Sequence, residues 1–131
     1  MKRFAILFGC LALLASPALA TSDFNKMWKE KYITDDDANE DLKKTARKHG
    51  CYICHVSKQK KDVRNEYGKA VNKFLKAEDY PKDWVKANPE EARKKIFAGL
   101  DEAAKEKSKD GDTFGDKMKA GKVPAVDHGK D

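Results

Sequence analysis

Two cysteines and a histidine stand close together in the segment Cys51-Tyr52-Ile53-Cys54-His55. Cysteines two residues apart, with a histidine directly after the second, form the pattern that attaches a c-type haem. Such a turn holds two sulfurs at the separation of the two haem vinyl groups, so each thiol can add to one vinyl. The next residue then lies below the ring, where His55 can bind the iron as its proximal ligand. We therefore predict one covalently bound haem c at Cys51, Cys54 and His55.

Two other kinds of site use cysteines with this spacing. A structural zinc ion needs four ligands, but the sequence has no second cysteine pair, and the only histidine after His55 is His128. A thioredoxin-like redox pair needs a βαβ context, and no strand pattern surrounds the motif. The haem interpretation is therefore favoured, and a non-haem zinc or structural CxxC module remains as an alternative.

The first twenty residues are typical of an export signal peptide. Lys2 and Arg3 precede an apolar run over 4–15, and a small-x-small cleavage sequence ends at Ala20. The run is too short for a transmembrane anchor. Cys10 is interpreted as an ordinary residue of the signal, because almost no apolar core precedes it as a lipoprotein signal would require. We predict cleavage after Ala20 and an exported location such as the bacterial periplasm.

The chain is basic, with 28 Lys and Arg residues against 22 Asp and Glu residues. Its formal charge of +6 falls to +4 when Lys2 and Arg3 leave with the signal. A basic surface can attract acidic proteins or anionic membranes. Nucleic acid is not an expected partner, because the lysines alternate with acidic residues and the protein is exported. The two cysteines that remain after cleavage both lie in the motif, which excludes a disulfide framework.

Helical spacing of apolar residues predicts short helices on both sides of the motif. The first covers about 24–32. A second is predicted to start at Thr34, a hydroxyl cap followed by three aspartates, and to run to about His49. Gly50 is expected to end it in a left-handed conformation and lead into the motif.

Three further segments continue this pattern towards the C-terminus. Asn65 is predicted to cap a helix that buries Tyr67, Val71 and Phe74, with Gly68 approached closely by another element. A short apolar turn or helix follows around 84–85. The clearest helix start is then Asn88-Pro89, with the helix running to about Lys107. The sequence therefore predicts an all-α fold.

A methionine late in the chain is a candidate for the sixth position of the iron. Met118 is flanked by Gly115 and Gly121, and a thioether ligand raises the reduction potential of a haem. Other possibilities remain open: Met118 can pack against Phe114, His128 can be the ligand, or the iron can be five-coordinate. The tail over 127–131 is predicted to be frayed.

These residues together resemble those of small exported monohaem c-type cytochromes. In class I members a helix precedes the CxxCH motif, further helices follow, and a Met in a Gly-flanked loop binds the iron. Cys51, Cys54 and His55 match the attachment residues, and the segment ending at Met118 is similar to the Gly-x-x-Met loop. The segment over 64–70 is similar to a recurrent sequence in some small bacterial cytochrome-like proteins.

The resemblance covers about 35–124, and only its CxxCH pentapeptide is specific. Class I members add a long helix after the Met loop, whereas this chain ends thirteen residues after Met118. The resemblance implies a cytochrome c-like bundle of short helices around one haem. The predicted organisation is a signal peptide over 1–20, a helical extension over 21–34, a haem domain over 35–126 and a tail over 127–131.

The resemblance implies a monomeric one-electron carrier, and the sequence shows no catalytic constellation that would make it an enzyme. A Lys-rich surface would dock acidic redox partner proteins transiently. A five-coordinate haem sensor or a peroxidase-like protein, with an open position at the iron, is the alternative within the haem interpretation.

Overall fold

The computed structural model describes residues 21–34, 39–56, 59–60 and 63–125, and these ranges hold helices and turns but no β-strand. In chain order the elements are α1 (Thr21–Tyr32), α2 (Glu40–His49), the 3₁₀ turn η2 (Gly50–Ile53), α3 (Glu66–Phe74), the 3₁₀ turn η3 (Ala77–Asp79), α4 (Lys82–Ala87), α5 (Pro89–Lys105) and α6 (Phe114–Lys119). The all-α prediction is therefore confirmed for this part of the chain. The signal peptide, His128 and the tail over 127–131 lie outside the described residues.

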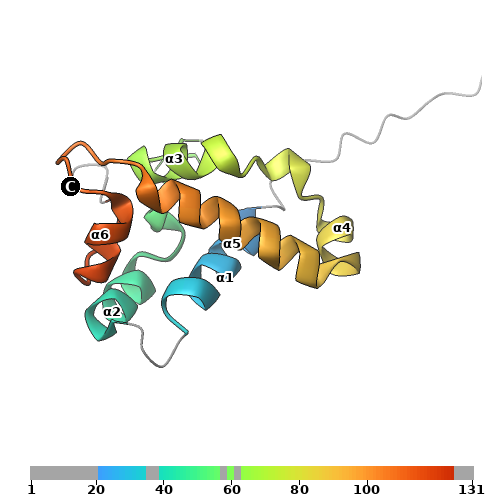
Figure 1. The fold of residues 1–131 in the computed structure, drawn as a ribbon, viewed down its shortest axis with the longest axis horizontal. Coiled ribbons are helices and arrows are strands. Elements are labelled where there is room, and N and C mark those ends of the chain that lie inside the picture. The colour runs from blue at the N-terminus through green and yellow to red at the C-terminus, as the bar shows by residue number, and fades with distance from the viewer. Residues whose placement is uncertain (1–20, 35–38, 57–58, 61–62, 126–131) are drawn as a thin grey trace, which may run out of the picture.

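Helix α5 lies at the centre of the molecule. Figure 1 shows α3 along one side of it and α1 along the other, with α4 near its start and α6 near its end. Pro89 occupies the first turn of α5, where its missing N–H leaves no hydrogen bond unmade. One apolar face of the helix is fully buried and consists of Ala92, Ile96, Leu100 and Ala103. Helices α1, α3, α4 and α6 pack against α5.

The predicted ends of α5 need two corrections. Asn88 does not cap it with its side chain. The Asn88 amide instead donates to the carbonyl oxygen of Trp84 at 3.0 Å, which closes the end of α4. The helix ends at Lys105, two residues before the predicted Lys107. The cause is a turn in which the backbone N–H of Glu106 donates to the carbonyl of Ala103.

The cap of helix α2 lies five residues after Thr34, the residue that was predicted to be its cap. The cap is Asn39, whose side-chain oxygen accepts from the backbone N–H groups of Asp41 and Leu42. The Thr34 hydroxyl instead donates to the carbonyl of Lys29 at 2.9 Å, so it belongs to the end of α1. The predicted end at His49 is confirmed, and Gly50 has a positive φ of 52°.

Helix α3 begins as predicted, with the Asn65 side chain accepting from the backbone N–H of Gly68 at 2.8 Å. Tyr67 and Val71 are buried, but Phe74 is 41% exposed, so its predicted core position is wrong. The backbone leaves the helix after Phe74, and Leu75 adopts an extended conformation that points its side chain at α5. Leu75 therefore occupies the core position that was expected for Phe74.

Aromatic side chains connect α1, α3 and α6 inside the molecule. Trp28 is 2% exposed, and its indole N–H donates to the hydroxyl of Tyr67 at 3.0 Å. The Tyr67 ring meets the Phe114 ring edge-on, with 5.2 Å between the centroids. The Tyr32 ring also lies next to Trp28, with 5.3 Å between the two ring centroids. Helix α1 is therefore part of the same core as the helices that follow the motif.

Candidate functional site

The CxxCH motif forms a tight turn directly after α2. The backbone N–H groups of Cys54 and His55 both point to the carbonyl oxygen of Cys51, at 3.4 and 3.3 Å. Ile53 is only 2% exposed, so its side chain anchors the turn in the core. Cys51 is exposed and Cys54 half-buried, and neither is in a disulfide. The turn thus holds its two thiols at different depths.

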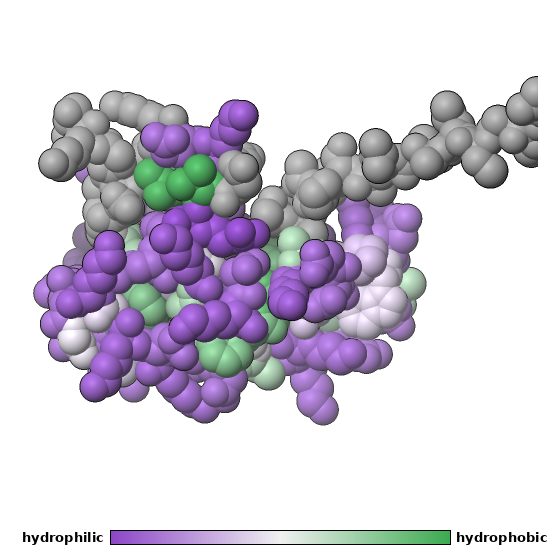
Figure 2. All heavy atoms as spheres, turned by 90° about the horizontal axis from the view of Figure 1, so that it is seen from above, coloured by the Kyte–Doolittle hydropathy of each residue, from purple (hydrophilic) through white to green (hydrophobic). Residues whose placement is uncertain are grey.

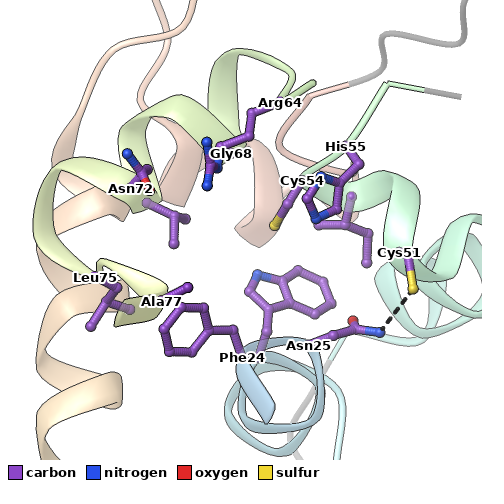
Figure 3. A pocket seen from close by; sticks show the side chains of 13 residues that line it. Phe24, Asn25, Cys51, Cys54, His55, Arg64, Gly68, Asn72, Leu75 and Ala77 are labelled. Atoms are coloured by element: carbon purple, nitrogen blue, oxygen red, sulfur yellow. Dashed lines mark hydrogen bonds between the residues drawn. The ribbon is translucent and has the colours of Figure 1, made fainter. Parts of the chain in front are cut away.

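A cavity opens beside this turn, and we call it the motif cavity. Its cavity volume is about 130 Å³, or about 850 Å³ when the open space at its mouth is included, and apolar surface makes up most of its wall. Its wall comes from α1 (Phe24, Asn25, Trp28), the motif (Cys51, Ile53, Cys54, His55), the start and face of α3 (Arg64, Gly68, Val71, Asn72) and the segment after α3 (Leu75, Ala77). Figure 3 shows these side chains around one central space. All three residues predicted to bind the haem therefore line one cavity.

The thiol of Cys54 is kept protonated by its surroundings. Burial raises its pKa to about 12, the neighbouring Cys51 adds to the rise, and the positive charge of Arg64 opposes it. A thiolate, rather than a thiol, is the nucleophile of cysteine chemistry. In the unmodified chain Cys54 is consequently a weak nucleophile at neutral pH.

This difference predicts unequal alkylation of the two cysteines. At pH 8 a thiol with a pKa of about 12 is ionised in about one molecule in ten thousand, so we expect iodoacetamide to modify exposed Cys51 at least about tenfold faster than Cys54. The rates are measured by mass spectrometry of the peptides of the unmodified chain. In guanidinium chloride the burial that raises the pKa of Cys54 is lost, so the two rates should converge. Equal rates in the folded chain would contradict the described burial.

The imidazole of His55 lies at the edge of the motif cavity, as Figure 3 shows. Its Nδ1 atom is buried. The backbone of His55 pairs with that of Arg64 in an isolated antiparallel bridge, and the N–H of Val56 donates to the carbonyl of Val63 at 3.1 Å. The segment that enters α3 therefore runs beside the motif and fixes the backbone from which the imidazole projects.

Gly68 brings α3 into direct contact with the motif. A Cβ atom at this position would collide with the backbone carbonyl of Cys54 and would lie 3.1 Å from the Cβ of Arg64. The close approach that was predicted for Gly68 is therefore present, and its partner is the motif itself. Only a residue without a side chain lets the helix pass this carbonyl.

Met118 is not part of the motif cavity. It lies in α6 rather than in a loop, is 3% exposed, and lines a separate hollow together with Tyr32 and Leu42. The structure therefore brings Cys51, Cys54 and His55 together and places Met118 elsewhere.

Several wall residues had no role in the sequence prediction. Asn25 is one of them, and its side-chain nitrogen lies 3.9 Å from the sulfur of Cys51. Asn72 is another, one helical turn after Gly68 and therefore on the same face of α3. The spacing of Asn72 from Gly68 could have predicted that both lie on the face of α3 that lines the cavity. No sequence spacing connects Asn25 with Cys51, because the two residues belong to different elements.

Among the described residues there is no group of three or more His, Cys, Asp or Glu side chains that could hold a metal ion. In the same ranges no helix has the length and apolar character needed to cross a membrane. Comparison with known proteins finds no family model, no curated protein and no solved structure that matches the chain.

Proposed function

We propose that the protein is an exported c-type cytochrome that carries one haem on Cys51 and Cys54 and transfers single electrons. The observation that supports this most is the shared position of both thiols and the His55 imidazole at one mainly apolar cavity. A porphyrin is a large apolar ring with two vinyl groups at one edge, and these residue types match it.

Each residue has a separate task in this proposal. The thiols of Cys51 and Cys54 would each add across a vinyl double bond, with the thiol hydrogen going to the adjacent vinyl carbon, so that no oxidant is consumed. His55 would bind the iron through its imidazole. Haem iron supplies a reversible one-electron change of oxidation state. The rings of Phe24 and Trp28 would exclude water from the macrocycle, and a low local dielectric is one determinant of its reduction potential.

A second candidate follows from the position of Met118. Because Met118 lines a different hollow, no described residue of the predicted Met loop faces the motif cavity. An iron without a protein ligand at its sixth position can bind a small gaseous ligand or peroxide. This favours a five-coordinate haem sensor or peroxidase-like protein as the alternative to the electron carrier.

The surface agrees with transient docking to acidic redox proteins. Hydrophilic side chains cover most of the face in Figure 2, with a small hydrophobic group beside the grey segments. Tyr52, within the motif, is 45% exposed, and Val63, in the chain segment that pairs with the end of the motif, is 40% exposed. A polar, basic surface with only a small apolar group suits short-lived complexes.

The decisive experiment produces the full chain in cells that are competent in cytochrome maturation. We expect the wild-type protein to gain the mass of one haem and to show the visible spectrum of thioether-linked haem. The variant with both Cys51→Ser and Cys54→Ser should be colourless and lack this mass, because no thiol remains to add to a vinyl group. Cys10→Ser is the matched control, since Cys10 lies in the predicted signal, and should keep the haem.

A colourless wild-type protein without added mass would refute the cytochrome proposal. The same sample separates the two haem candidates. A carrier with six ligands should not bind carbon monoxide in its reduced form, whereas ready binding would support the sensor or peroxidase-like protein. Met118→Ala should leave the spectrum unchanged if the hollow that Met118 occupies is separate from the haem.

A further inference from the structure

Asn65 has more contacts with the motif than a helix cap requires. It is only 1% exposed. Its side-chain oxygen accepts from the N–H of Gly68, which is the capping bond of α3. Its side-chain nitrogen points the other way and donates to the carbonyl oxygen of Ile53 at 2.8 Å and to that of Tyr52 at 3.3 Å. These are the two residues between the cysteines.

The backbone of Asn65 adds a further bond to the same turn. Its N–H donates to the carbonyl of Cys54 at 3.0 Å. Three successive carbonyls of the motif, those of Tyr52, Ile53 and Cys54, are therefore held by one residue. The orientation of the amide is fixed by its partners, because only the oxygen can accept from an N–H and only the nitrogen can donate to a carbonyl.

We propose that Asn65 is the positioning residue of the site, which fixes the motif turn so that Cys51, Cys54 and His55 are presented to one cavity. Its hydrogen bonds go to the backbone that carries the thiols and the imidazole, and it acts through that backbone. Catalytic and binding groups need supporting hydrogen bonds of this kind, since a loosely held group loses its geometry. The inference rests on the proposed function for the identity of the bound group, but its effect on the thiols is measurable without that group.

Two substitutions separate the capping role from the positioning role. Asn65→Ser and Asn65→Asp both keep an oxygen that can cap α3, and Ser, Asp and Asn are about equally good caps. Neither has the amide nitrogen that holds the carbonyls of Tyr52 and Ile53. Asn39 provides the matched control, because it caps α2 in the same way while its amide nitrogen donates to the distant carbonyl of Lys119 at 3.2 Å.

The test measures three quantities on the full chain of each Asn65 variant and of Asn39→Ser and Asn39→Asp. In the unmodified chain, we expect alkylation of Cys54 at pH 8 to become at least about tenfold faster in the Asn65 variants and to stay within about twofold in the Asn39 variants. In chains matured with haem, we expect the covalent yield to fall at least about tenfold and the reduction potential of the remainder to shift only in the Asn65 variants. The helical signal in circular dichroism should be retained in all four.

The outcomes are distinguishable. Unchanged Cys54 alkylation, haem yield and potential in both Asn65 variants would overturn the positioning role while leaving the proposed function intact. A wild-type chain that never carries haem, together with faster Cys54 alkylation in the Asn65 variants, would refute the proposed function and support the positioning role. Loss of folding in both Asn65 variants, with folding retained in both Asn39 variants, would also overturn the inference, because Asn65 would then determine the whole fold.

Discussion

Replacing Trp28 with alanine is expected to lower the free energy of unfolding by about 3–5 kcal/mol. Trp28 is 2% exposed, its indole lies next to the Tyr32 ring, and its indole N–H donates to the Tyr67 hydroxyl. Truncation therefore opens a void and leaves the buried Tyr67 hydroxyl without its donor. Urea unfolding of the wild-type and Trp28→Ala chains, followed by circular dichroism, measures the difference.

The control for Trp28 is Trp84, which is the same residue type in a less buried place. Trp84 lies in α4, is half-buried, and has the ammonium group of Lys95 at 5.3 Å from its ring centroid. We expect Trp84→Ala to cost about 1–2 kcal/mol, because less apolar surface leaves contact with the protein. If both variants lose the same free energy, Trp28 does not have the central place in the core that the structure gives it.

Replacing Gly68 with alanine is expected to disrupt the motif more than the rest of the fold. An exposed helix position would gain up to about 1 kcal/mol from this change, but here the new methyl group would meet the carbonyl of Cys54. That carbonyl cannot move freely, since the backbone N–H of Asn65 holds it at 3.0 Å. Overpacking of this kind typically costs about 1–3 kcal/mol. We therefore expect lower stability in urea and a lower covalent haem yield.

Gly115→Ala is the matched change at a second helical glycine. A Cβ there would lie 3.1 Å from the carbonyl oxygen of Ala104, which is tight but not a collision. We expect its stability to stay within about 0.5 kcal/mol of the wild type, the usual range for substitutions without a specific clash. A Gly68→Ala chain as stable and as well loaded with haem as Gly115→Ala would show that α3 does not press on the motif.

Local signals predicted the parts of the fold that depend on a few neighbouring residues. Asn65, Gly50 and Pro89 were placed correctly at helix ends because a cap, a positive φ and a missing N–H are satisfied within one turn of the backbone. The CxxCH turn is equally local, which is why the sequence alone could single out its three residues as a candidate site. Their shared cavity needed α1 and α3 as well.

The start of α2 shows why other predictions failed. Thr34 and Asn39 are both acceptable caps, and nothing within one helical turn decides between them. The structure uses Asn39, whose amide also donates to the carbonyl of Lys119, eighty residues away. The place of Met118 likewise depends on how α6 packs against α5. Contacts between residues so far apart leave no pattern in the spacing of a single sequence.

The packing of α1 on α5 also has a consequence for the order of events during synthesis. The hydroxyl of Tyr32 donates to the carbonyl of Leu100, sixty-eight residues later in the chain. Helix α1 therefore cannot pack in its final position until α5 has been made. Pairing over such a distance is slow compared with the formation of a local turn. While the polypeptide is being made, the motif therefore lacks the wall of its cavity that α1 provides, and this wall is completed only when the last third of the chain has arrived.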